Sequence, residues 1–157
     1  MLRISKLTDY ATVILAHLAD AGAGLRTAVD LAERSRIGVP TVSKVLKELQ
    51  RAGLVSSTRG AHGGYTLARA AHTISAADII DAVEGPVGLT ECSTHPGQCG
   101  LESSCRVGHS WQRVNTAIRR ALGEIPLTEL ASDPTAGRPP AELNIVLGAR
   151  PGLRGRA

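Results

Sequence analysis

The chain holds three cysteines, and all of them lie in one short stretch as Cys92, Cys99 and Cys105. Thiolates are soft ligands that suit zinc, copper(I) or iron–sulfur clusters. Structural zinc sites usually contain cysteine pairs two to four residues apart, whereas the gaps here are six and five residues. Wide gaps suit a larger group, because a loop can wrap around a cluster of several iron atoms. The spacing predicts an iron–sulfur site, with three unconnected buried thiols as the alternative.

Three thiolates leave a ligand position open, and three side chains are candidates for it. His109 follows Cys105 by four residues, so both lie on one face if a helix begins there. His95 is nearer in sequence but stands beside Pro96 in the loop. Asp9 projects opposite the apolar stripe of the first expected helix, where it could reach a cluster in a partner subunit. Spacing alone does not choose among them.

The composition restricts the class of protein. Hydrophobic residues make up 43% of the 157 residues but aromatic residues only 2%, with no Phe, so the core must be aliphatic. No apolar run approaches the roughly 20 residues of a membrane span, and charges interrupt the N-terminus where a signal peptide needs an apolar stretch. An odd cysteine count without an export signal indicates a reducing compartment. We therefore expect a soluble, cytoplasmic protein with no membrane partner.

The charge is distributed unevenly. Residues 1–75 carry ten Lys or Arg and five Asp or Glu, a net charge of +5. Residues 76–157 carry eight and nine, a net charge of −1, and the two halves sum to +4. A basic first half is typical of a protein that binds phosphate groups, including those of nucleic acid.

The first half has the periodicity of a winged helix. Apolar spacing predicts three helices, over residues 5–19, 28–34 and 40–52. Two short strands around a glycine-rich loop follow, over residues 54–58 and 65–68. A helix–turn–helix followed by a small hairpin is a winged helix, so the expected fold is mainly α with a small β-hairpin wing.

The third helix has the features of a recognition helix. Lys44, Lys47 and Arg51 fall together on its outer face, where they can neutralise phosphates beside a major groove. Thr41 and Ser43, near its start, are short enough to let it approach base edges. A solvated helix face is the alternative, and the wing that follows favours DNA.

The loop of the expected wing carries Arg59, Gly60 and His62. Arg59 is followed by three glycines within five residues, which places a cation on a slim loop that can enter a minor groove. These three residues complete the predicted DNA-binding set.

The second half continues with a helix, a cysteine loop and a longer helix. Ser75 and Asp78 form a capping-box pattern that predicts a fourth helix. The longer helix has one apolar face, formed by Trp111, Val114, Ile118, Ala121, Leu122 and Ile125. Because such a helix needs a partner, a second copy of the chain is expected to cover it.

Four segments follow from these patterns. They are a winged helix–turn–helix region over 1–84, a cluster-binding loop over 85–106, a dimerisation helix over 107–130 and a flexible basic tail over 131–157.

Three stretches carry a resemblance to a known family: residues 2–11, the wing over 53–67, and the three-cysteine loop. Over about residues 1–130 the chain resembles the winged-helix iron–sulfur transcriptional regulators, which include IscR-like and NsrR-like proteins. Its start is most similar to the regulators of SUF iron–sulfur assembly genes. The resemblance implies a homodimeric transcription factor, not an enzyme, whose DNA affinity depends on a 2Fe–2S cluster, with 4Fe–4S as the alternative.

The resemblance also implies roles for single residues. Arg59 matches the wing arginine that enters the minor groove, and Asp9 matches the aspartate that ligates a cluster in NsrR-like proteins. Ser43 stands where IscR-like proteins have a glutamate that helps choose between DNA sites. Relative to them, the first cysteine gap is one residue longer and the histidine after Cys105 comes one position later. The residues that match the cluster thiolates are Cys92, Cys99 and Cys105. Those at base-reading positions of the recognition helix are Thr41, Ser43 and Lys44.

The sequence thus predicts a dimeric repressor of SUF-type genes that senses iron–sulfur supply, binds a palindromic operator and takes no small-molecule substrate. A sensor of nitric oxide or thiol oxidation with the same fold is one alternative. A small iron–sulfur electron carrier is the alternative from a different class.

Overall fold

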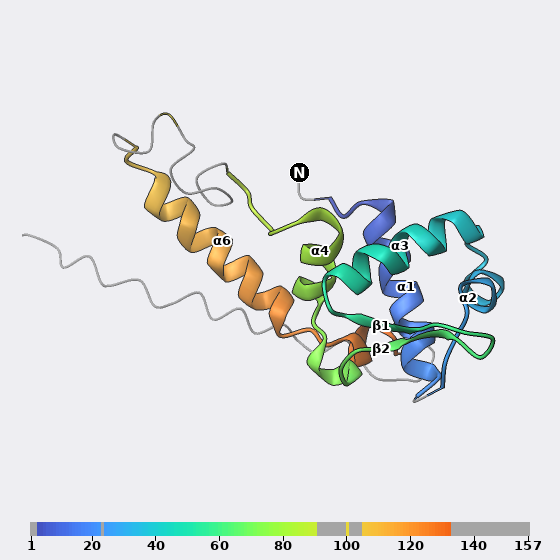
Figure 1. Cartoon of the computed structure of the whole chain (residues 1–157). Helices are drawn as coiled ribbons and strands as arrows, with labels where there is room; N and C mark the ends of the chain where they lie inside the picture. The colour runs from blue at the N-terminus through green and yellow to red at the C-terminus, as the bar shows by residue number, and fades with distance from the viewer. Residues whose placement is uncertain (1–2, 23, 91–99, 101–104, 133–157) are drawn as a thin grey trace, which may run out of the picture.

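Helices dominate the structure, and one antiparallel hairpin projects from them (Figure 1). The computed structural model describes residues 3–22, 24–90, 100 and 105–132. Its elements are α1 (Lys6–Asp20), α2 (Ala28–Ser35), α3 (Val39–Arg51), β1 (Val55–Thr58), β2 (Gly64–Leu67), the 3-10 turn η1 (Ala71–Thr73), α4 (Ala76–Glu84), α6 (Gly108–Gly123) and α7 (Leu127–Leu130). This arrangement confirms the expected winged-helix fold. No helix in these ranges is long and apolar enough to cross a membrane.

The core is aliphatic, as the composition predicts. Its buried cluster contains only Ala, Val, Leu and Ile side chains, drawn from α1, α2, α3, β1, α4 and α7 and from the segments between them. Tyr10 and Tyr65 pack against the cluster from its edge. Helix α1 begins where Ser5 accepts a hydrogen bond from the Thr8 N–H at 3.2 Å, and its predicted stripe from Ala11 to Leu18 is buried.

The helix–turn–helix forms from local signals. Helix α2 ends at Arg36, whose left-handed backbone (φ 56°) turns the chain. Pro40 lies in the first turn of α3, where its missing N–H costs no helical hydrogen bond. The four apolar residues expected to face inward on α3, Val42, Val45, Leu46 and Leu49, are all fully buried.

The wing is attached to the segment before α2. Val55 pairs with Leu67 and Thr58 with Gly64 in the hairpin. Arg26 then bridges Tyr65 through two backbone hydrogen bonds of 3.0 and 2.8 Å. A Cβ at Gly64 would lie 2.9 Å from the Arg26 carbonyl oxygen, so this close approach requires glycine.

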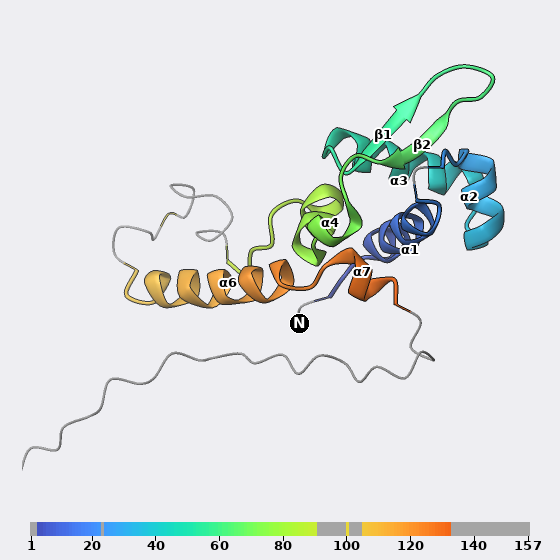
Figure 2. The ribbon, with the colours of Figure 1, turned by 90° about the horizontal axis from the view of Figure 1, so that it is seen from below.

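Helix α6 projects from the helical bundle and is shorter than expected (Figure 2). The single helix predicted over 107–130 is two segments, because α6 ends at Gly123 and α7 begins at Leu127. Pro126 disfavours a helical backbone at the residue before it. Leu127 is fully buried in the core, and its N–H donates to the Ile74 carbonyl at 2.7 Å. The end of the expected dimer helix therefore returns to the winged helix.

The predicted capping box of α4 is present. Ser75 accepts from the Asp78 N–H, and the Asp78 carboxylate accepts from the Ser75 N–H at 2.8 Å and pairs with Arg69 at 2.9 Å. Although partial burial raises the pKa of Asp78, the hydrogen bonds from Ser75 and the nearby Arg69 outweigh it and hold the pKa below its usual value.

Leu127→Ala tests whether α7 anchors the second half of the chain. We expect the free energy of unfolding in urea, at fixed protein concentration, to fall by about 2–5 kcal/mol, because a buried leucine is replaced by a cavity. Leu130→Ala is the matched control, since Leu130 belongs to the same short helix but is 40% exposed, and should change stability by about 0.5 kcal/mol or less. Equal effects of the two substitutions would contradict this role of Leu127.

Candidate nucleic-acid interface and cysteine site

The outer face of α3 presents two free cations. Lys44 and Lys47 are exposed, and neither forms an ion pair or hydrogen bond with a residue that the structure describes. Ser43 is exposed beside them, and Thr41 is half-buried at the start of the helix. The lysine ammonium groups are therefore available for phosphate oxygens, and the two short side chains allow close approach to base edges.

Arg51, the third predicted cation of this helix, is already paired. Its Nη1 donates to both carboxylate oxygens of Glu48 at 3.0 Å. A phosphate would have to compete with this carboxylate, and the three-residue spacing of Glu48 and Arg51 in a predicted helix is the signal that could have indicated the pair. Sequence reasoning also missed Gln50, whose Nε2 donates to the Ser57 Oγ at 2.9 Å and ties α3 to β1.

The wing lies beside α3 and carries the other predicted DNA-binding residues. Arg59, Gly60 and His62 are all exposed in the turn between β1 and β2, and Figure 2 shows this turn projecting beyond the helices. Gly60 has φ +117°, a backbone conformation that side-chain-bearing residues rarely adopt. The Gly63 N–H closes the turn on the Gly60 carbonyl at 2.9 Å. The fold thus places a cationic hairpin tip next to a cationic helix face.

Only the last of the three cysteines falls in the described part of the chain. Cys92 and Cys99 lie outside it, as do His95 and the tail from residue 133. Cys105 is a free, half-exposed thiol just before α6. A Cβ added at Gly108 would lie 3.6 Å from its Sγ, so the sulfur rests against the first turn of that helix. No group of three metal-ligating side chains occurs within the described ranges.

The candidates for a fourth ligand lie in different parts of the fold. His109 is exposed in the first turn of α6, at the same end of that helix as Cys105. Asp9 is exposed on α1, and α1 belongs to the helical bundle from which α6 projects (Figure 1). The structure therefore groups Cys105 with His109 and separates both from Asp9 of the same chain.

The start of α1 is fixed to the end of α4. The Glu84 carboxylate accepts hydrogen bonds from the Ser5 N–H at 2.9 Å and from the Thr8 hydroxyl. These hydrogen bonds, that of Thr8 first, hold the pKa of Glu84 below its usual value. Asp9, one residue after Thr8, is thereby held close to the end of the helix that precedes the cysteine loop.

Comparison with known proteins shows the family to which the chain belongs. A family model described as "Rrf2: Iron-dependent Transcriptional regulator" matches residues 4–133. The chain belongs to the Rrf2 family. Protein rrf2 of Nitratidesulfovibrio vulgaris is 30% identical over 133 residues, which cover 84% of this chain and 89% of that protein. The HTH-type transcriptional regulator IscR of Vibrio vulnificus is 36% identical over 104 residues, 66% of this chain and 61% of that protein.

Solved structures agree with the Rrf2 assignment. CymR, described as the global cysteine regulator of B. subtilis, matches with a TM-score of 0.65 and 30% identity, over 85% of this chain and 100% of that one. IscR of T. potens matches with a TM-score of 0.59 and 29% identity, over 82% and 85%. This Rrf2 chain is accordingly a winged-helix, DNA-binding transcriptional regulator and not an enzyme.

Arg59→Ala tests the wing of this Rrf2 regulator. On DNA selected by the protein from a random pool, we expect affinity to fall at least about fivefold, in the range of a lost minor-groove or base contact. Arg120→Ala is the control, because Arg120 is an exposed arginine on α6 that pairs with Glu124 of the same segment. Fluorescence anisotropy at one fixed salt concentration measures both affinities. Equal binding by the wild type and Arg59→Ala would remove the wing from the interface.

Proposed function

We propose that this Rrf2 regulator is a homodimeric repressor of SUF-type iron–sulfur assembly genes that senses through a bound iron–sulfur cluster. The observation that supports the cluster is Cys105, a free and half-exposed thiol seated at the first turn of α6. Cys92 and Cys99 precede it in the same acidic loop and supply two further thiolates. Three thiolates without a close cysteine pair suit iron–sulfur ligation better than structural zinc.

His109 of the same chain or Asp9 of a partner subunit would complete the ligand set. When bound, a 2Fe–2S or 4Fe–4S cluster supplies an iron-dependent link between the thiolates. Cys105 attaches the end of the loop to the first turn of α6. The hydrogen bond from the Val87 N–H to Asp81 attaches the segment before the loop to α4. Iron supply would thus be converted into the order of a loop that joins two helices.

The dimer is carried by a heptad seam that begins at Val107, the residue before α6, and continues along that helix. The seam consists of five apolar residues, Val107, Trp111, Val114, Ile118 and Ala121, spaced alternately four and three apart. Val107, Trp111 and Val114 are 57%, 44% and 43% exposed in the single chain. Alternating spacing of this kind is the pattern of a two-stranded coiled coil. A second α6 would bury the seam and place two recognition helices on one DNA duplex, as a palindromic operator requires.

Val114→Asp tests the seam. A charge in the middle of a closed apolar interface is strongly unfavourable, so the variant should sediment as a monomer at concentrations where the wild type is a dimer. Thr116→Asp places the same charge elsewhere on α6, at an exposed polar position, and should leave the dimer intact. A Val114→Asp dimer of wild-type stability would show that the subunits associate through another surface.

Cys105→Ala tests the cluster. After anaerobic purification, the wild type should contain iron and acid-labile sulfide in matched amounts, with visible absorption. Cys105→Ala and Cys92→Ala should lose both elements while keeping the circular dichroism of the fold. His109→Ala and Asp9→Ala, prepared in parallel, identify the fourth ligand by which of them loses iron. A wild type that binds zinc or no metal even after reconstitution would contradict the cluster.

Thiol oxidation is the second candidate signal. It is favoured by the free, half-exposed state of Cys105 and by the match to a solved oxidised form of Staphylococcus aureus CymR, with a TM-score of 0.60 and 30% identity over 84% of this chain. In that case the metal-free protein would change its DNA affinity with oxidant, reversibly with a thiol reductant. The iron and sulfide assay above separates the two signals.

A further inference from the structure

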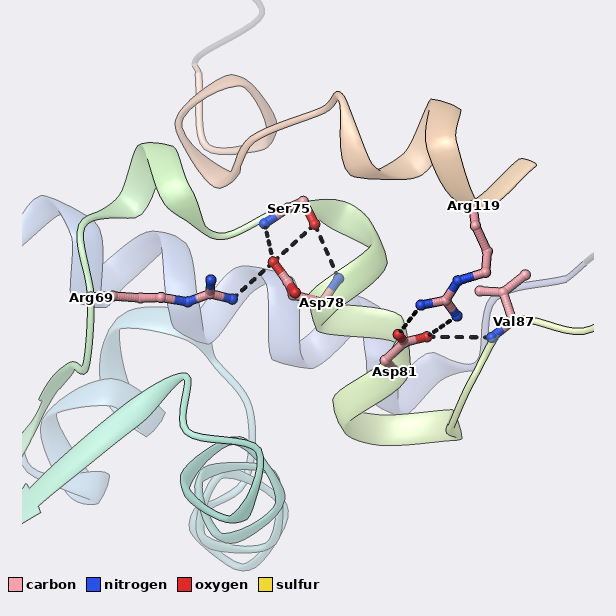
Figure 3. Close-up of polar contacts among 6 residues, drawn as sticks. All are labelled: Arg69, Ser75, Asp78, Asp81, Val87 and Arg119. Carbon is pink, nitrogen blue, oxygen red and sulfur yellow. Dashed lines mark hydrogen bonds and ion pairs between the residues drawn. The ribbon is translucent and has the colours of Figure 1, made fainter. Parts of the chain in front are cut away.

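One carboxylate, that of Asp81 on α4, holds together three segments of the regulator. Arg119 of α6 donates to it twice, from Nη1 to Oδ1 at 3.0 Å and from Nη2 to Oδ2 at 2.7 Å (Figure 3). The Val87 N–H, on the segment that leads toward the cysteine loop, donates to the same Oδ1 at 3.3 Å. Asp81 therefore contacts both the chain that runs into the loop and the helix that leaves it.

The geometry of the Asp81–Arg119 pair is suited to fixing the direction of the α6 axis relative to α4. Two parallel hydrogen bonds between a planar guanidinium and a planar carboxylate set orientation as well as distance. Both side chains are about two-thirds buried, with 38% and 30% of their surfaces exposed. The hydrogen bonds to Asp81 raise the pKa of Arg119 above its usual value, which shows that the contact favours the charged guanidinium.

Helix α6 is attached to the winged helix at two places. The first is the return of the chain to the core, where the Ala76 N–H donates to the Ile125 carbonyl at 2.9 Å. The second is Arg119, on the side of α6 that packs against α4, whereas the exposed seam lies on the adjoining side of the helix. One turn from Arg119, Asn115 is 7% exposed, but its Oδ1 receives no hydrogen bond. Arg119 thus provides the specific polar contact at the second place.

Because Arg119 lies near one end of α6, a small rotation of the helix at this contact produces a large displacement at its other end. Helix α6 runs eleven residues from Arg119 back to Gly108, a length of roughly 16 Å at 1.5 Å per residue. A rotation of roughly 10° about Arg119 would displace the seam at the far end by roughly 3 Å. Because α4 also packs against the recognition helix α3, the same rotation changes the angle between seam and recognition helix.

We propose that Asp81 and Arg119 are positioning residues that set the half-site spacing this regulator accepts in its operator. They fix the direction of α6 relative to α3, and in a dimer joined by α6 that direction determines how far apart the two recognition helices lie. The proposal rests on the dimer proposed above and goes beyond it, because it assigns spacing specificity to a contact that touches neither DNA nor the seam.

The test compares operators whose half-sites are moved apart or together by one base pair. For the wild type, we expect each such operator to bind about tenfold or more weakly than the selected one, a loss in the range of a mismatched base pair. For Arg119→Met, which keeps an unbranched apolar stem but removes the guanidinium fork, the same change should cost about threefold or less. Arg119→Lys, which keeps the charge without the fork, should fall between them.

Arg120→Met is the matched control, because the Arg120–Glu124 pair at 3.1 Å lies within α6 and is far more exposed, at 82% and 59%. It should keep the wild-type spacing profile. A general loss of stability would weaken binding to all operators alike, so the spacing profile separates positioning from folding. If Arg119→Met does not fold by circular dichroism, Asp81→Asn, which retains the acceptor for Val87, takes its place.

A wild-type spacing profile in folded, dimeric Arg119→Met and Asp81→Asn would overturn the inference and leave the proposed function standing. A dimeric wild type that binds all spacings equally would likewise overturn the inference alone, whereas a monomeric wild type would overturn both.

Discussion

The burial of Leu127 determines how the two halves of this chain are joined. Because its side chain fills the core beside α1 and the 3-10 turn, the last long helix must end early and the backbone must return to the bundle. Helix α6 is consequently attached to the helical bundle near its C-terminal end, and its N-terminal end projects away from the bundle. Three of its seam residues are left exposed by the described residues of the same chain, and that geometry favours a partner subunit over an intramolecular core.

The same constraint separates the two sites of the regulator. The predicted DNA-binding residues lie on α3 and the wing, whereas Cys105 lies at the far end of α6. Two covalent routes connect these regions, the segment after α4 and α6 itself, and both pass Asp81. A change in the cysteine loop can alter DNA affinity only if it shifts an equilibrium between arrangements of these connections. An ion pair that contacts both routes is therefore the natural place for such coupling.

Local signals were sufficient for most of the fold. The apolar stripe of α1, Pro40 at the start of α3, the glycines of the wing and the Ser75 capping box each act within a few residues, and each prediction was confirmed. The features that the sequence did not reveal are contacts between residues far apart along the chain. Periodicity continues through Ile125 and cannot indicate that Leu127 belongs to another part of the core. The Asp81–Arg119 contact joins residues 38 positions apart. Over that separation the order of charges along the sequence does not indicate which side chains meet.

The ion pairs within the chain show which basic side chains are already neutralised, which the net charge does not. Elsewhere, Arg34 pairs with Asp30, Arg69 with Asp78 and Arg119 with Asp81. These cations are neutralised within the chain and add little to the field that a phosphate backbone meets. Lys44, Lys47 and Arg59 have no such partner among the described residues. The exposed Arg3, Lys6 and Arg36 likewise form no ion pair among the described residues, so pairing alone does not single out the interface. Because counterion release depends on cations that can reach phosphates, we expect the unpaired cations on α3 and the wing to contribute more to DNA binding than the paired ones.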